Sequence, residues 1–229
     1  MDRGSRFLTK QANVSFNPEA DCPRWKSFLN EITDDDTEVI IQLQKAIGYT
    51  LSGNTDAQLF FVCTGSGANG KSVLLEVINY LMGSYSGKIN ATTLTGSAPN
   101  KIPNELAALT GKRFITVSEM PIGQIINTTT LKELTGQDTV SARFLYKEFF
   151  ELKPKFKIWI ATNRMLEFIE NSHALYRRMV TFEFPIFFAQ NERDPKLLQK
   201  LKDEADGIFN WALDGYKLFQ DEGFGEINH

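Results

Sequence analysis

One motif constrains the fold of this chain more than any other feature. Residues 59–75 read LFFVCTGSGANGKSVLL, in which a glycine-rich turn lies between two apolar runs. The turn matches the pattern G-x-x-x-x-G-K-S, with a strand expected before it and a helix expected after it. Glycines in such a turn allow positive φ angles, which point successive backbone N–H groups toward an anion. The motif therefore predicts a P-loop that binds the phosphates of a nucleotide.

Each position of the motif has an expected role. Lys71 is expected to contact the β- and γ-phosphates, and the Ser72 hydroxyl to complete the coordination of Mg²⁺. The N-terminus of the following helix reinforces the anion site. The residues expected to bind ATP are Gly65, Ser66, Gly67, Ala68, Asn69, Gly70, Lys71 and Ser72. An ordinary glycine turn is the alternative, and the flanking strand and helix patterns argue against it.

The composition allows a medium-sized domain that needs neither disulfides nor a structural metal. With 229 residues, 42% of them hydrophobic, the chain can bury a substantial core. Two isolated cysteines and two histidines suggest no disulfide framework and no zinc site. The apolar runs have the length of strands and no signal peptide is recognisable, so we expect a cytoplasmic protein without membrane contact. Because the net charge is −3, any contact with DNA must be local.

Hydrophobic periodicity divides the chain into three parts. Residues 1–56 are expected to form a helical lead-in, and residues 191–229 a C-terminal helical segment with possible breaks at Gly207 and Gly215. Between them, residues 57–190 alternate short apolar strands with helices or loops. The expected strands are 59–63, 114–117, 158–161 and 179–184. This alternation around a P-loop predicts an α/β fold with a mainly parallel sheet flanked by helices.

Two polar residues follow apolar strands where a P-loop enzyme needs them. Glu119, after the strand at 114–117, is the expected general base and, with Ser72, a candidate metal-binding residue. Because Ser118 stands where a second acid is usual, direct carboxylate coordination of Mg²⁺ is left open. Asn163 is suited to orient the attacking water or to bind the γ-phosphate. A solvated glutamate and an asparagine that only ends a strand are the alternatives.

The order and spacing of these features resemble the superfamily 3 helicases, which are AAA+ ATPases, and most closely the primase-helicases of phages, plasmids and poxviruses. In that branch a serine before the glutamate is common. The resemblance implies a homo-oligomeric ring, usually a hexamer, that hydrolyses ATP and moves along single-stranded DNA during replication. It also implies a primase domain in the full-length protein. The segments that carry it are GSGANGKS at 65–72, ELAALTGKRFITVSE at 105–119, LKELTGQDTVSARFLYKEFFELKPKFKIWIATN at 131–163 and ALYRRMVTFEF at 174–184.

The resemblance also implies a DNA-binding hairpin. Apolar and polar residues alternate sufficiently within residues 138–157 to predict two strands. The family places a β-hairpin here, and its tip projects into the central channel of the ring. Lys147 is the first candidate for contact with the DNA backbone, and Arg143 and Lys153 are weaker candidates. An exposed hairpin that uses lysine to discourage edge pairing is the alternative.

Two arginines precede the strand at 179–184. The resemblance makes an arginine here the finger that reaches the γ-phosphate bound by the neighbouring subunit, with Arg178 as the first choice and Arg177 as the second. A solvated pair that bridges to Glu167 or Glu170 is the alternative.

Other classes of protein share the P-loop. A small-molecule kinase usually has an arginine-rich lid, but no arginine follows Arg193. A GTPase needs the pattern Asn-Lys-x-Asp, which residues 162–165 do not match. A non-translocating module that binds ATP to hold an oligomer together remains open.

Overall fold

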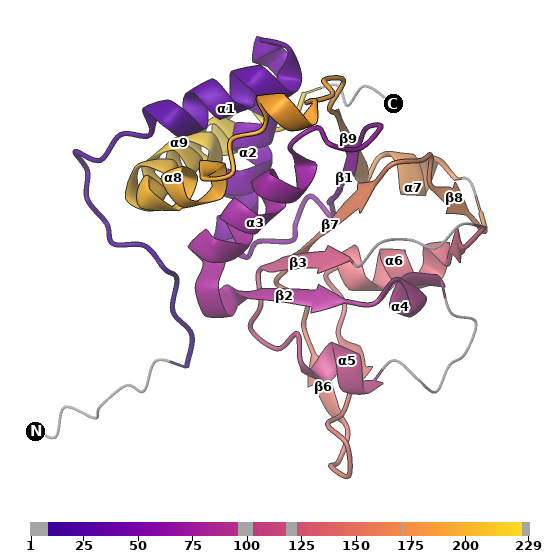
Figure 1. Ribbon diagram of the computed structural model, residues 1–229. Helices are drawn as coiled ribbons and strands as arrows, with labels where there is room; N and C mark the ends of the chain where they lie inside the picture. The colour runs from indigo at the N-terminus through magenta and orange to yellow at the C-terminus, as the bar shows by residue number, and fades with distance from the viewer. Residues whose placement is uncertain (1–8, 96–102, 118–122, 171, 226–229) are drawn as a thin grey trace, which may run out of the picture.

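A five-stranded parallel sheet lies at the centre of the molecule (Figure 1). The computed structural model describes residues 9–95, 103–117, 123–170 and 172–225. The strand order is β2-β3-β7-β1-β9, and every neighbouring pair is parallel. The bounds are β1 Phe60–Thr64, β2 Ser86–Ile89, β3 Phe114–Val117, β7 Lys157–Thr162 and β9 Met179–Glu183. The expected α/β fold with a mainly parallel sheet is confirmed.

Helices cover both faces of the sheet, so its central strands are almost continuously apolar. One face packs against α1 (Pro23–Thr33), α2 (Thr37–Ser52), α3 (Lys71–Met82), α8 (Leu197–Asp203) and α9 (Ala205–Glu222). The other packs against α4 (Ala91–Thr95), α5 (Pro103–Ala107), α6 (Thr128–Thr135) and α7 (His173–Tyr176). The side chains of β1 alternate between these cores, with Phe61 in the first and Phe60 in the second.

Several small elements lie outside the central sheet. β4 (Ile125–Ile126) pairs with β8 (Glu167–Phe168) in a parallel ribbon, and two short 3₁₀ helices, η1 and η2, span Gly83–Tyr85 and Gln190–Glu192. Of the helices that the structure describes, none has both the length and the apolar character required to cross a bilayer.

Helices α2 and α9 pack closely through glycines. A Cβ on Gly48 of α2 would overlap the backbone of Tyr216, and a Cβ on Gly215 of α9 would overlap the backbone of Gln44. Gly207 approaches the backbone that precedes α1 in the same way. Because α9 continues through Gly207 and Gly215, the expectation that they break the helix is wrong. The missing Cβ allows close contact between backbones instead.

Glu204, between α8 and α9, caps the first helix. Its carboxylate accepts hydrogen bonds from the backbone N–H groups of Arg24 (3.0 Å) and Trp25 (2.9 Å) in the first turn of α1. These N–H groups have no acceptor within their own helix, and the helix dipole also favours a carboxylate there. The C-terminal helices therefore hold α1 in place.

Lys157, at the start of β7, is a lysine within the core. Its side chain is 1% exposed, and its Nζ has no hydrogen-bond partner among the described residues. Burial, with a smaller effect from the charge of Arg113, lowers the pKa of Lys157 to about 7. The face of the Tyr49 ring, whose centre is 4.1 Å from Nζ, acts in the opposite direction because it favours the ammonium form.

The lowered pKa predicts that Lys157 destabilises the fold at neutral pH. As the pH falls from about 10 to about 7, the unfolded chain takes up a proton at this lysine that the folded chain does not, so the free energy of unfolding decreases. Below about pH 7 Lys157 is protonated in both the folded and the unfolded chain, so the free energy of unfolding does not decrease further through this lysine. Lys157→Met should therefore raise the melting temperature at pH 7, by about 2–4 °C for each kcal/mol gained. The gain should shrink as the pH approaches about 10.

Thermal unfolding followed by circular dichroism at both pH values measures this difference. Lys155→Met, a change at an exposed lysine two residues earlier, is the matched control. If Lys157→Met raised the melting temperature equally at pH 7 and at about pH 10, protonation of Lys157 would not be the cause of the increase.

Candidate active site

The glycine-rich turn joins β1 to α3 with the backbone conformation expected from the sequence. The φ angles of Gly65, Gly67 and Gly70 are 149°, 101° and 86°, in the region that glycine adopts most readily. Ala68 also has a positive φ, of 50°. Its carbonyl accepts a hydrogen bond from the N–H of Phe188 (2.9 Å), which fixes the turn against the chain that follows β9. Since α3 begins at Lys71, its N-terminus opens onto the turn.

The ammonium group of Lys71 is held by neutral acceptors. Its Nζ donates to the carbonyl of Gly65 (2.9 Å) and to Oδ1 of Asn69 (3.0 Å), and Nδ2 of Asn69 donates to the carbonyl of Phe184 (3.2 Å). Within the described ranges, no carboxylate forms an ion pair with Lys71. Burial lowers the pKa of Lys71 below its ordinary value. A buried cation without a carboxylate partner favours the binding of an anion.

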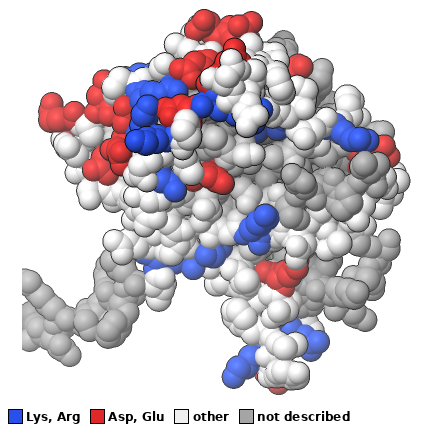
Figure 2. All heavy atoms as spheres, in the orientation of Figure 1, with Lys and Arg blue, Asp and Glu red and all other residues white. Residues whose placement is uncertain are grey.

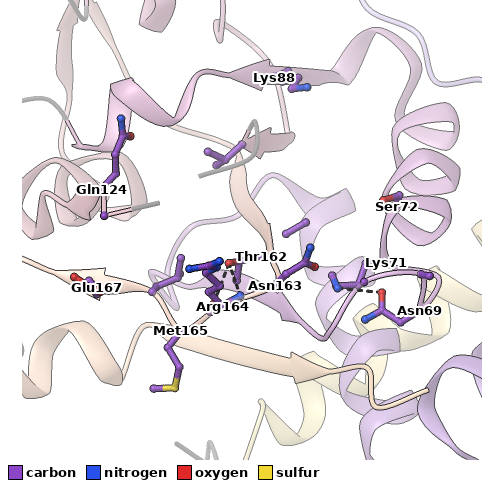
Figure 3. Close-up of a pocket in the computed structure, with 16 residues that line it drawn as sticks. Asn69, Lys71, Ser72, Lys88, Gln124, Thr162, Asn163, Arg164, Met165 and Glu167 are labelled. Carbon is purple, nitrogen blue, oxygen red and sulfur yellow. Dashed lines mark hydrogen bonds between the residues drawn. The ribbon is translucent and has the colours of Figure 1, made fainter. Parts of the chain in front are cut away.

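A cavity of about 810 Å³ opens beside this turn (Figure 3). Lys71 and Ser72 line it from the start of α3, and Asn163 lines it from the end of β7. A Cβ placed on Gly67 would lie 3.8 Å from Nδ2 of Asn163, so this amide faces the turn closely. The structure therefore brings together the P-loop lysine, the serine and the asparagine that the sequence singled out. The cavity is called the active-site cavity below.

Strand pairing explains the position of Asn163. β1 and β7 are parallel neighbours, and Thr64 pairs with Thr162, so both chains leave the sheet at the same edge. The Thr162 hydroxyl then accepts a hydrogen bond from the N–H of Arg164 (3.1 Å) and donates one to its carbonyl (2.9 Å). This tight turn holds Asn163 between the two residues.

The cavity also contains polar residues that the sequence did not identify as part of the site. Lys88, Gln124, Arg164 and Glu167 all line it. Lys88 lies on β2, which pairs with β3 at the edge of the sheet and was not among the expected strands. Arg164 directly follows Asn163, and its place next to the predicted asparagine was the signal that could have identified it.

The expected general base lies outside the described residues. Ser118 and Glu119 both belong to the segment 118–122, for which the structure gives no description. Val117, the last residue of β3, lines the active-site cavity. The role of Glu119 stays a prediction.

The two candidate finger arginines differ in their surroundings. Nη1 of Arg178 donates to the carbonyl of Lys132 (3.1 Å) and to the hydroxyl of Thr135 (3.2 Å), both in the last turn of α6. Arg177 is exposed. Neither arginine is among the residues that line the active-site cavity of its own chain.

The hairpin expected within residues 138–157 is present. β5 (Val140–Ala142) and β6 (Phe150–Leu152) pair antiparallel, and the connecting residues 143–149 extend away from the body of the molecule (Figure 1). Lys and Arg side chains lie near the end of this projection (Figure 2). Lys147 is exposed within the connection, and Lys153 is exposed just after β6.

The hairpin tip also carries apolar side chains that the sequence analysis did not single out. Phe144, Leu145, Tyr146 and Phe149 are all exposed, and the side chain of Tyr146 is 94% exposed. The guanidinium carbon of Arg143 lies 4.6 Å from the centre of the Phe149 ring. Contiguous exposed apolar groups of this kind mark contact surfaces. The interleaving of basic and aromatic residues in RFLYKEF (143–149) was the signal available in the sequence.

Two viral proteins are similar to this chain in sequence. "Putative helicase L207/L206" of Acanthamoeba polyphaga mimivirus is 33% identical over 177 residues, which cover 76% of this chain and 18% of the relative. "Putative helicase 022R" of Frog virus 3 (isolate Goorha) is 33% identical over 152 residues, which cover 64% and 16%. The chain therefore spans less than a fifth of the length of these relatives.

The fold is similar to a solved structure described as "The A form apo structure of NrS-1 C terminal region-CTR". The TM-score is 0.71 at 16% sequence identity, and the match covers 90% of this chain and 49% of that one. In sequence, residues 63–178 match the model described as "Family of unknown function (DUF5906)". Because this match covers half of the chain, from β1 through Asn163 to Arg178, the chain belongs to the DUF5906 family.

Proposed function

We propose that this chain is an ATP-driven helicase domain of the superfamily 3, AAA+ type, which moves along single-stranded DNA during replication of a virus, phage or plasmid. The observation that carries the proposal is the buried Lys71, held by neutral acceptors in a positive-φ turn and sharing a cavity with Asn163. The helicase names of the viral relatives support a role in replication. A primase domain in the full-length protein is part of the proposal.

The residues assigned to ATP hydrolysis have separate roles in this proposal. Lys71 and the backbone N–H groups of the turn hold the β- and γ-phosphates, and Asn163 orients the attacking water. Glu119 takes a proton from that water. No group of three His, Cys, Asp or Glu side chains that could hold a metal occurs among the described residues. In this proposal Ser72 is a protein ligand of Mg²⁺, with Glu119, which lies outside the described residues, as the second candidate. Few protein ligands suit Mg²⁺, because this ion keeps phosphate and water ligands.

Substitutions at Lys71 and Glu119 should distinguish the binding of Mg-ATP from its hydrolysis. Lys71→Ala should weaken binding of Mg-ATP on the order of 100-fold, because it removes the charge-assisted contact to the phosphates. Glu119→Gln should keep this affinity and reduce turnover by about 10²–10⁴-fold. Isothermal titration and a phosphate-release assay measure the two effects, with Lys155→Ala as the control. Near-normal turnover in Glu119→Gln would remove Glu119 from the role of base.

The surroundings of the arginines favour Arg177 as the finger in a homo-oligomeric ring, which reverses the order expected from the sequence. Arg178 already has two acceptors on α6 of its own chain, and moving it to a neighbour would leave the carbonyl of Lys132 without this donor. Arg177 is exposed and can reach outward. An arginine fork suits the charge that develops on the γ-phosphate.

Arg177→Ala should therefore bind ATP but lose about 10³-fold or more in turnover, whereas Arg178→Ala should mainly lower the stability of the fold, by about 1–3 kcal/mol. A mixture of Arg177→Ala with Lys71→Ala should regain some activity, because it contains interfaces with one intact P-loop and one intact finger. Phosphate release from the mixture at increasing protein concentration tests this. An inactive mixture of variants that still assemble would contradict the assignment.

The hairpin tip is the proposed contact with single-stranded DNA. Lys147 and Arg143 supply local positive charge for the phosphates, and the exposed ring of Tyr146 offers a face on which an unpaired base can stack. Duplex DNA does not present free base faces, so the aromatic tip favours single strands.

The two kinds of contact predict different salt dependences. Lys147→Ala should weaken binding to all sequences and reduce the slope of log affinity against log salt by about one unit. Tyr146→Ala should weaken binding about 5–100-fold with an unchanged slope, since stacking releases no counterions. Fluorescence anisotropy with a labelled oligonucleotide at several salt concentrations gives both values, and Tyr146→Phe is the matched control. Wild-type affinity in both alanine variants would leave the hairpin without a role in DNA binding.

A non-translocating ATPase is the remaining alternative. Stimulation of ATP turnover by single-stranded DNA is expected for a translocase, and its absence at all protein concentrations would favour a module that binds ATP only to hold an oligomer together.

A further inference from the structure

The parallel strands give the central sheet two chemically different ends. The P-loop and Asn163 follow the carboxyl ends of β1 and β7, where the active-site cavity lies. At the other end, Lys112 precedes β3, and the chain enters β7 from the hairpin. Lys112 does not line the active-site cavity. The charges at this amino end of the sheet therefore lie apart from the residues assigned to ATP hydrolysis.

Two lysines lie together at the amino end of the sheet. The side chain of Lys10 crosses Gly111, since a Cβ on that glycine would lie 2.7 Å from Cε and 3.9 Å from Nζ of Lys10. Nζ of the next residue, Lys112, donates to the carbonyl of Ser84 (2.9 Å). The N–H of Ser84 donates to the carbonyl of Gln11 (2.9 Å), which fixes the segment that carries Lys10. These two lysines are called the lysine pair below.

Within the described chain, no carboxylate balances the charge of the lysine pair. None of the ion pairs between described residues includes Lys10 or Lys112. Burial, and to a smaller extent the charge of Lys10, lowers the pKa of Lys112. Two like charges held near each other repel, and an anion bound beside both would offset this repulsion. The lysine pair therefore favours the binding of an anionic group.

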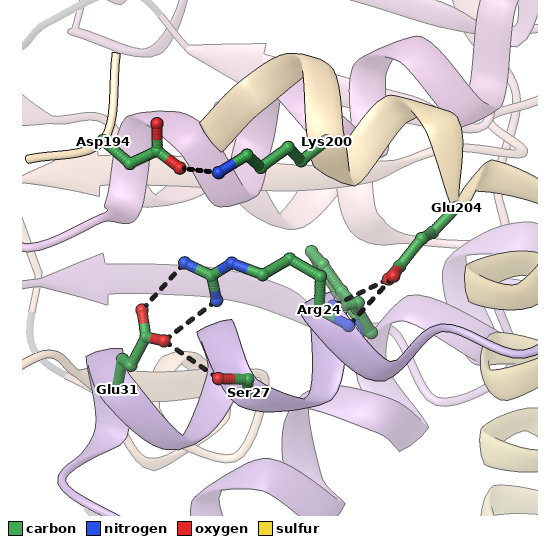
Figure 4. Close-up of polar contacts among 7 residues, drawn as sticks. Arg24, Ser27, Glu31, Asp194, Lys200 and Glu204 are labelled. Carbon is green, nitrogen blue, oxygen red and sulfur yellow. Dashed lines mark hydrogen bonds and ion pairs between the residues drawn. The ribbon is translucent and has the colours of Figure 1, made fainter. Parts of the chain in front are cut away.

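Cations on the helical half of the molecule are paired instead. The guanidinium of Arg24 donates to both carboxylate oxygens of Glu31 (2.9 and 3.1 Å), and Lys200 pairs with Asp194 at 2.6 Å (Figure 4). Asp and Glu side chains gather over α1, α8 and α9, whereas Lys and Arg side chains predominate between β2 and the hairpin (Figure 2). A chain with a net charge of −3 thus has a local excess of positive charge on this side.

The chain itself connects the hairpin to the amino end of the sheet. Leu152, the last residue of β6, is buried, Lys153 is exposed, and Lys157 begins β7. The N–H of Lys157 donates to the carbonyl of Arg113 (2.8 Å), the residue after Lys112. Lys153 therefore lies along the route from the hairpin to the lysine pair.

The surroundings of the lysine pair offer charge but no surface for stacking. In the segments 9–13, 83–88 and 110–113, which the structure describes, no large apolar side chain is exposed. Lysines contact phosphates as point charges and do not by such contacts distinguish one base from another. A nucleic-acid strand would therefore be held here through its backbone, whatever its sequence.

We infer that the lysine pair is a second contact for the phosphate backbone of the DNA strand that binds at the hairpin tip. The inference rests on the proposed DNA binding by the hairpin and extends it, because a strand that follows Lys153 from the tip reaches Lys10 and Lys112. A strand of about six nucleotides would occupy the tip alone, whereas one of about 30 nucleotides would reach both contacts.

Single strands of these two lengths test the inference. Lys10→Ala combined with Lys112→Ala should weaken binding of the long strand about tenfold and reduce the slope of log affinity against log salt by about 1.4 units, which is about 0.7 for each lost phosphate contact. Affinity for the short strand should stay within about twofold, since it does not reach these lysines. Lys147→Ala should weaken binding of both strands. Fluorescence anisotropy at several salt concentrations measures these values.

Three further variants serve as controls. Lys217→Ala removes the same charge from α9, where Lys217 pairs with Asp214 at 2.8 Å, and should leave both affinities unchanged. Lys10→Arg combined with Lys112→Arg keeps the charges and should bind the long strand as the wild type does. Lys10→Ala alone leaves the hydrogen bond from Lys112 to Ser84 intact and should reduce the salt slope by about 0.7 units.

The outcomes distinguish this inference from the proposal beneath it. Wild-type affinity for the long strand in the double alanine variant, with Lys147→Ala still weakened, would overturn the second contact and leave the role of the hairpin intact. Equal loss of both strands in the double alanine variant would also overturn it, because the two lysines would then act through the hairpin or the fold. A wild-type chain that binds neither strand would overturn DNA binding at the hairpin, and the inference with it.

Discussion

The side chain of Lys71 loses most of its hydration when the P-loop forms, and the rest of the site depends on how that loss is offset. The carbonyl of Gly65 and the amide oxygen of Asn69 replace part of the lost hydration, but neither carries a negative charge. Burial therefore lowers the pKa of Lys71. A polyphosphate would supply the negative charge that these neutral acceptors lack. Folding of the chain therefore prepares Lys71 to bind an anion.

The order of the strands determines what surrounds this lysine. β1 lies between β7 and β9, so the P-loop leaves the sheet between the ends of these two strands. β7 leads to Asn163 and the polar active-site cavity. The chain after β9 contacts the other side of the turn. There the carbonyl of Phe184 accepts a hydrogen bond from the side chain of Asn69, and the N–H of Phe188 donates to the carbonyl of Ala68. The position of β1 between β7 and β9 thus gives the P-loop a polar side and an apolar side.

The sequence predicted those parts of the structure whose signals are local. Apolar runs next to turn residues predicted the glycine-rich turn and the central strands, and the structure contains both. β2 was missed because it is a short edge strand that reads Ser-Gly-Lys-Ile, so the place of Lys88 in the cavity was missed with it. The partners of Arg178 on α6 lie more than 40 residues earlier in the chain. No local pattern shows that these atoms meet.

The hairpin depends on support from the rest of the fold, because two strands of three residues are not stable alone. Ala142 and Leu152 are buried in the core on the α6 side of the sheet, and the N–H of Leu145 donates to the Asn104 side chain on α5 (3.1 Å). The next residue of α5, Glu105, accepts hydrogen bonds from Asn90 (2.8 Å) and Thr93, just after β2. The connecting segment of the hairpin is thus linked, through Leu145 and α5, to the residues that follow the strand carrying Lys88. The side chain of Tyr146 at the tip is nevertheless almost fully exposed, which is expected of a surface whose partner is another molecule.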